Sequence, residues 1–91
     1  MLKFIDLDFV SDCVGRNRMG RLCVTGEARS ELKAHSLTSK VLEEHGPNGN
    51  AVVRLTGNRA AIVRYIENVY APGDGKFYET FMRDCWKSNK S

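Results

Sequence analysis

The chain has no cysteine framework, no metal-binding motif and no long apolar run, and each absence excludes a class of protein. Its three cysteines, Cys13, Cys23 and Cys85, are odd in number and lie 10 and 62 residues apart. This spacing matches neither the paired disulfides of a small secreted domain nor a set of zinc ligands. We therefore interpret the three thiols as structural, and we expect no metal centre.

Long apolar runs are missing as well. The longest has three or four residues, whereas a membrane-spanning helix needs roughly 20. Near the N-terminus, Asp6 and Asp8 interrupt anything that could serve as the apolar region of a signal peptide. We therefore expect a cytoplasmic protein without a membrane partner.

Catalytic signatures are also absent. The two histidines, His35 and His45, have no cysteine or carboxylate at ligand spacing, and the sequence pairs neither of them with a nucleophile. The loop between Gly15 and Gly20 lacks the Gly-Lys-Ser/Thr ending of a nucleotide-binding P-loop. We therefore expect a protein that is not an enzyme and that needs no cofactor.

The composition is that of an ordinary globular domain, with 42% hydrophobic and 27% charged residues. We expect one domain over residues 1–86 and a flexible tail over residues 87–91, because the tail has no apolar anchor. Fourteen Lys and Arg against eleven Asp and Glu give a net charge of +3. This mildly basic balance permits a nucleic-acid or an acidic protein partner and requires neither.

One local pattern occurs twice. Thr25-Gly26 and Thr56-Gly57 each follow a short run typical of a strand and precede a stretch with helical spacing. Alternating apolar and polar side chains predict strands over residues 2–10, 21–25 and 51–55. Apolar stripes at helical spacing predict helices over residues 27–44, 59–70 and 76–87. The acids of the first strand favour an edge position, where charge discourages further pairing.

The resulting order, β-β-α-β-α-α, predicts an α+β fold. We expect a small two-layer sandwich with a three-stranded sheet and helices packed on one face. If the second and third strands lie parallel in that sheet, the connection between them should be a right-handed crossover. In general layout only, this order resembles ferredoxin-like and KH-like sandwiches. A KH clamp has two residues between its glycines, whereas Gly15 and Gly20 enclose four.

The strongest functional pattern is a basic loop. Residues 15–21, Gly-Arg-Asn-Arg-Met-Gly-Arg, carry three arginines and an asparagine. A guanidinium group pairs with phosphate in a bidentate manner and stacks on bases. The alternative is a solvated hairpin loop whose arginines pair with acids such as Asp12 and Glu27.

A second basic group lies further along the chain. Arg54 alternates with Val53 and Leu55 and should therefore lie on the opposite face of its strand. Arg59 follows the second Thr-Gly turn, near a helix N-terminus that favours anions. The leading hypothesis is a nucleic-acid-binding protein, with RNA preferred over DNA. The residues expected to bind phosphate are Arg16, Asn17, Arg18, Arg21, Arg54 and Arg59.

A rival hypothesis depends on the aromatic C-terminal stretch. Two neighbouring rows at helical spacing give the last helix a wide aromatic face, formed by Phe77, Tyr78, Phe81, Met82 and Trp86. Exposed aromatic and Met side chains are typical of protein interfaces. This face would suit a regulator, inhibitor or adaptor of the kind that phages and mobile elements encode, and it could also form a homodimer.

Overall fold

The computed structural model describes residues 2–84. Its elements in chain order are β1 (Lys3–Phe9), a 3₁₀ turn (Ser11–Cys13), β2 (Val14–Arg16), β3 (Leu22–Val24), α1 (Gly26–Ala34), β4 (Thr38–Glu43), β5 (Ala51–Gly57), α2 (Arg59–Tyr65), a π-helical segment (Ile66–Tyr70), α3 (Gly75–Glu79) and β6 (Arg83–Asp84). The predicted α+β class is confirmed. The strands predicted over residues 2–10 and 51–55 are confirmed as β1 and β5.

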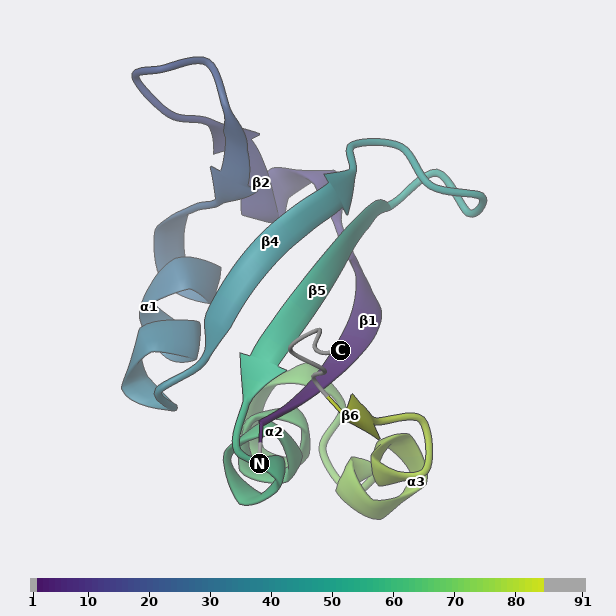
Figure 1. Cartoon of the computed structure of the whole chain (residues 1–91). Coiled ribbons are helices and arrows are strands. Elements are labelled where there is room, and N and C mark those ends of the chain that lie inside the picture. Colours follow the sequence, from purple (N-terminus) through teal and green to yellow (C-terminus); the bar gives the residue numbers. More distant parts are fainter. Residues whose placement is uncertain (1, 85–91) are drawn as a thin grey trace, which may run out of the picture.

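The main sheet has four strands in the order β4-β5-β1-β6, and each neighbouring pair is antiparallel (Figure 1). The predicted three-stranded sheet is therefore wrong, as is the parallel crossover considered with it. Strands β2 and β3 form a separate two-stranded sheet. They pair with each other because only residues 17–21 separate them, and closing so short a loop costs little entropy.

The helix predicted over residues 27–44 is wrong beyond its first half. The N–H of Leu37 donates to the carbonyl of Leu32, and the N–H of Ser36 donates to that of Lys33. This Schellman pattern satisfies the last carbonyls of α1 and ends the helix. Ser36 adopts the left-handed conformation that the cap requires, with φ 58°. The chain then returns as β4, which pairs with β5 as a hairpin partner.

The helix predicted over residues 76–87 is also too long. α3 has five residues, and β6 follows it and pairs with Lys3 and Phe4 of β1. The carboxylate of Glu67 accepts hydrogen bonds of 2.8 Å from the N–H groups of Gly73 and Gly75. The π-helical segment therefore caps the N-terminus of α3. Residues 85–87 of the predicted helix, and the predicted tail, lie outside the described residues.

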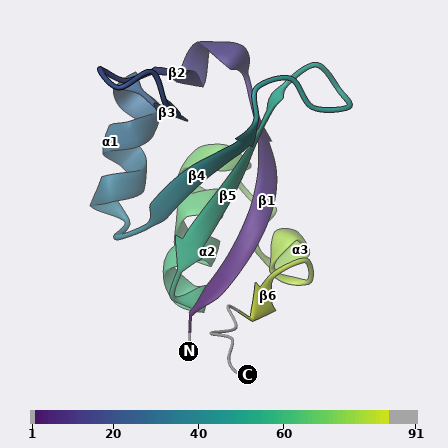
Figure 2. The same ribbon diagram turned by 45° about the horizontal axis from the view of Figure 1, so that its top comes forward.

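The core lies between the main sheet and the helices α1 and α2, which lie on one face of the sheet (Figure 2). Alternation along β1 and β5 places every second side chain on that face, as the sequence predicts. The buried apolar side chains include Ile5, Leu7, Phe9, Leu32, Val53, Leu55, Ile62 and Ile66. α3 packs against α2 and the π-helical segment.

The opposite face of the sheet is polar. Asp6 and Arg54 are cross-strand neighbours in the register of β1 and β5. Arg54 donates to both carboxylate oxygens of Asp6, at 2.8 and 3.1 Å, and its guanidinium carbon lies 4.3 Å from the centre of the Phe4 ring. The expected edge position of the first strand is wrong at its start, where β6 pairs with Lys3 and Phe4, but β6 does not reach Asp6 and Asp8. A charged side chain is tolerated there because its partner strand supplies the counter-charge.

Candidate functional site

The hairpin formed by β2 and β3 extends beyond the body of the protein (Figure 1). Asn17 holds its tip, because its side-chain oxygen accepts from the N–H groups of Met19 at 2.9 Å and Arg21 at 3.0 Å. The backbone N–H of Asn17 donates to the carbonyl of Arg21, and the carbonyl of Asn17 accepts from the N–H of Gly20, both at 2.9 Å. Arg16 donates to the carbonyl of Gly20 at 2.7 Å. The tip is therefore fixed by its own hydrogen bonds.

This fixed tip presents free positive charge. Arg16 pairs with Glu44 at 3.4 Å, so the alternative of arginines neutralised by acids applies to this residue. Arg18 and Arg21 are exposed, and their guanidinium groups form no ion pair or hydrogen bond within residues 2–84. Between them Met19 is 80% exposed. Two guanidinium groups therefore flank an apolar side chain on a rigid loop.

The other two predicted arginines lie elsewhere. Arg54 lies on the polar face of the sheet and is paired with Asp6. Arg59 begins α2 and is bound to the carboxylate of Glu79. It lies at the far end of β5 from the hairpin (Figure 1), and a strand of that length spans about 23 Å. The structure thus brings together residues 16, 17, 18 and 21, and it separates Arg54 and Arg59 from them.

The aromatic residues of the rival hypothesis divide between surface and core. Phe77 and Phe81 are 61% and 56% exposed, and their rings meet edge to face at 5.3 Å. Tyr78 and Met82 are half-buried and pack against the core. Trp86, the proposed anchor, lies outside the described residues. A short helix followed by a strand produces this division, because the two rows do not continue on one helical face.

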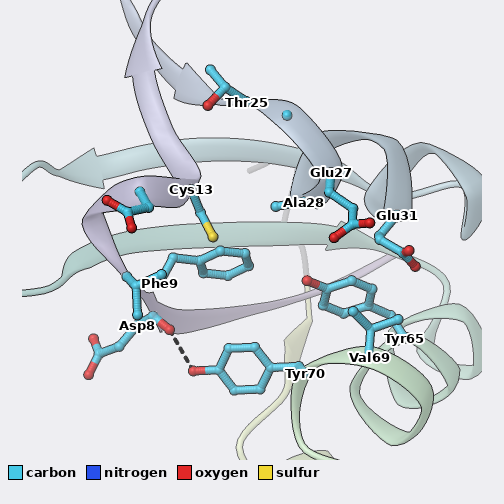
Figure 3. A pocket seen from close by; sticks show the side chains of 13 residues that line it. Asp8, Phe9, Cys13, Thr25, Glu27, Ala28, Glu31, Tyr65, Val69 and Tyr70 are labelled. Carbon is cyan, nitrogen blue, oxygen red and sulfur yellow. Dashed lines mark hydrogen bonds between the residues drawn. The ribbon is translucent and has the colours of Figure 1, made fainter.

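A pocket of about 460 Å³ lies between the end of β1, the 3₁₀ turn, the start of α1 and the α2–π-helical segment (Figure 3). Aromatic rings of Phe9, Tyr65 and Tyr70 form part of its wall. Glu27 and Glu31 of α1 also line it, and in Figure 3 the carboxylate of Glu27 lies on the side of the Tyr65 hydroxyl. None of the 13 lining residues is basic. The pocket therefore combines an apolar wall with a negative rim.

The two tyrosine hydroxyls of the pocket differ. Tyr70 donates to the backbone carbonyl of Asp8 at 2.7 Å. Tyr65 is only 2% exposed, yet its hydroxyl, which points into the pocket, forms no hydrogen bond with any described residue (Figure 3). Burial, followed by the proximity of Cys13, Tyr70 and Glu31, raises the pKa of Tyr65 to about 12. Burial also raises the pKa of Tyr70.

The other reactive side chains of residues 2–84 form no centre. Among the described residues, no group of three or more His, Cys, Asp or Glu side chains is arranged to hold a metal. The ring nitrogen Nδ1 of His35 lies 2.8 Å from the carbonyl of Glu31, and the ring packs edge-on against Tyr65. Cys13 and Cys23 are half-buried free thiols, whereas Cys85 lies outside the described residues.

The pocket was missed by sequence reasoning. Its wall joins the end of β1 with residues more than 50 positions later, and no motif marks that proximity. One signal was present: Glu27 and Glu31 lie four residues apart and therefore share a helix face. The signal was weak, because Glu27 is exposed and Glu31 half-buried, and acids are common on the solvated side of a helix.

Comparison with known proteins identifies no relative, since no family model, curated protein or solved structure matches the chain. No helix between residues 2 and 84 is long and apolar enough to cross a membrane.

Proposed function

We propose that this protein binds nucleic acid, RNA in preference to DNA, through the tip of the β2–β3 hairpin. The observation that carries the proposal is the pair of exposed guanidinium groups, Arg18 and Arg21, on a loop fixed by hydrogen bonds. Guanidinium groups bind phosphate and stack on unpaired bases, which single-stranded RNA exposes. An apolar side chain such as Met19 can insert beside a base.

Rigidity of the tip supports binding. Ordering a flexible loop on association costs free energy, and a loop already held in place avoids much of that cost. Arg16 adds a third positive charge at the base of the tip, although Glu44 partly neutralises it. The contact surface is small, so we expect modest affinity and little sequence specificity, because phosphate contacts carry no base information.

Salt dependence gives the sharpest test of this mechanism. Neutralising two or three phosphates of a single strand predicts a slope of log affinity against log salt of about −1.4 to −2.1. Fluorescence anisotropy with a labelled single-stranded RNA, measured between about 50 and 200 mM salt, gives this slope. A duplex DNA and a single-stranded DNA of the same sequence test the preference for RNA.

The matched variants are Arg18→Ala/Arg21→Ala and a control, Arg64→Ala/Lys76→Ala, each of which removes two positive charges. Arg64 of α2 and Lys76 of α3 are exposed and form no ion pair within the described chain. We expect the hairpin variant to lose about tenfold or more in affinity and to flatten the salt slope, whereas the control changes affinity by less than about twofold. Equal losses in both variants would assign the binding to net charge and refute the role of the hairpin.

The exposed pair Phe77 and Phe81 favours a second candidate, a protein-binding regulator or adaptor. Exposed aromatic side chains in mutual contact are uncommon on a surface that stays in water, and they are enriched at interfaces. Light scattering would show a homodimer that becomes monomeric in Phe77→Ser/Phe81→Ser. A monomeric parent chain would refute the homodimer.

A further inference from the structure

We propose that the pocket between α1 and the α2–π-helical segment binds an organic cation, an ammonium or guanidinium group carried on a short apolar body. This site is separate from the hairpin tip and would exist whether or not the hairpin binds nucleic acid. Three independent features of the pocket support it: its charge, its unpartnered tyrosine hydroxyl and its aromatic wall.

The charge of the pocket is negative and uncompensated. Glu27 and Glu31 line it from successive turns of α1 (Figure 3), and like charges one turn apart repel each other. Neither carboxylate forms an ion pair or hydrogen bond within the part of the chain that the structure describes. Asp12 also lines the pocket, and no lining residue is basic. A cation between the carboxylates would relieve the repulsion, whereas an anion would increase it.

The hydroxyl of Tyr65 supplies the second observation. The hydroxyl oxygen of Tyr65 faces the open pocket, where solvent reaches it, and is not sealed in the core (Figure 3). A water bound there can be replaced by a ligand group that reproduces its hydrogen bonds. Tyr65 is 98% buried but its hydroxyl, which points into the pocket, has no partner among residues 2–84. The pKa of Tyr65, which burial raises to about 12, lies far above neutral pH, so the oxygen carries its proton there. The free lone pairs of this oxygen therefore suit the N–H groups of an ammonium or guanidinium ligand.

The remaining wall suits the apolar body of the ligand. Phe9, Val69 and Tyr70 line the pocket with carbon, and Phe9 and Tyr70 pack ring to ring at 5.6 Å. Aromatic faces attract cations in addition to excluding water. A volume of about 460 Å³ lies within the usual range of small-molecule sites. The ligand can be a free arylalkylamine or the side chain of an arginine in a peptide, since both present the same chemistry.

The test uses the full chain labelled with ¹⁵N and two matched pairs of probes. Phenethylammonium is paired with 2-phenylethanol, and N-acetylarginine amide is paired with N-acetylcitrulline amide, so that each pair differs in charge. We expect the cations to produce saturable amide shifts at residues 25–31 and 65–70. Each neutral partner should bind at least about tenfold more weakly, as expected when a charged hydrogen bond is lost.

Two variants locate the site. Glu31→Gln removes one charge, and Tyr65→Phe removes the unpartnered hydroxyl. Each should weaken cation binding by about fivefold or more. Glu43→Gln removes an exposed acid of β4 that does not line the pocket, and it should leave binding unchanged. Amide spectra of the free variants confirm that the fold is retained.

The outcomes distinguish the two ligand sources, a free amine and a peptide side chain, and they also show whether the proposal holds. Binding of phenethylammonium alone identifies a free amine as the ligand class, and binding of the arginine amide alone identifies a peptide side chain. Neutral partners that bind as tightly as the cations would overturn the proposal. So would the absence of saturable shifts at the pocket up to roughly 10 mM, a concentration that detects the affinity expected for so few ligand atoms. Equal weakening by Glu43→Gln would also overturn it.

Discussion

Removing one oxygen atom from Tyr70 and, separately, from Tyr65 should have different effects on stability. Both rings line the same pocket. Within residues 2–84 the hydroxyl of Tyr70 has a partner, the carbonyl of Asp8, whereas that of Tyr65 faces the pocket and has none (Figure 3). Tyr70→Phe deletes this hydrogen bond and leaves the carbonyl without it. Tyr65→Phe deletes a hydroxyl that has no hydrogen bond within the described residues.

The expected magnitudes follow from this difference. A typical hydrogen bond contributes about 1 kcal/mol net, so Tyr70→Phe should lower the free energy of unfolding by about 0.5–1.5 kcal/mol. In a chain of 91 residues, 1 kcal/mol corresponds to a fall in Tm of roughly 4–8 °C. Tyr65→Phe should change the free energy of unfolding by less than about 0.5 kcal/mol, because the hydroxyl faces solvent in the pocket and no hydrogen bond within the described residues is lost.

Urea denaturation of the parent chain, Tyr70→Phe and Tyr65→Phe, followed by circular dichroism, measures the change in free energy of unfolding that each substitution causes. The m-values should agree, because neither substitution alters the surface exposed on unfolding. Equal losses in the two variants would refute the reasoning, since they would show that the hydroxyl of Tyr65 has a stabilising partner. That result would also remove the second observation on which the cation site depends.

Four further predictions concern the same fold. Between pH 10 and 12 the unfolded state releases the proton of Tyr65 while the folded state retains it, so the free energy of unfolding falls as pH rises. The slope is at most about 1.4 kcal/mol per pH unit, and solvent at the pocket mouth makes it smaller. Urea titrations at several pH values should show this slope in the parent chain and a smaller one in Tyr65→Phe. Ser36→Gly should raise the free energy of unfolding by about 0.5–1 kcal/mol, because glycine adopts the left-handed cap without strain; a loss would show that the cap is not strained. Leu55→Ala should lower it by about 2–5 kcal/mol, because this side chain is fully buried, and a thermal melt within a few degrees of the parent would contradict that. Gly20→Ala should cost about 1 kcal/mol, because Gly20 has φ 79°, and it should weaken RNA binding in the anisotropy assay; unchanged affinity would show that the fixed tip is not needed.

Prediction from sequence succeeded where a pattern of apolar and polar residues fitted only one type of secondary structure. β1 and β5 alternate cleanly between apolar and polar residues, and only a strand buried on one face explains that alternation. β4 escaped prediction because Leu37 and Val41 are four residues apart and continue the stripe of α1. The signal that ends the helix there is a serine in a position where glycine is the usual marker, so the break was invisible.

The candidate site was predictable only in part, for a related reason. Arg16, Asn17, Arg18 and Arg21 are neighbours in the sequence, so their proximity follows from a short loop. The separation of Arg54 and Arg59 depends on the direction of β5 relative to the hairpin, which local patterns do not encode. The pocket requires β1 and the π-helical segment to meet across the core, and that contact is a property of the whole fold.

The interior position of β1 has a consequence for synthesis of the chain. β1 is the first strand, yet Lys3 pairs with Gly57 on one side and with Asp84 on the other. At a translation rate of about 5–20 residues per second, β1 waits roughly 3–10 s before its first partner strand has been made. During that time its apolar face and both its edges are uncovered, whereas the β4–β5 hairpin can form locally. We therefore expect the nascent chain to depend on chaperones until β5 leaves the ribosome, and a circular permutant that begins at β4 to depend on them less.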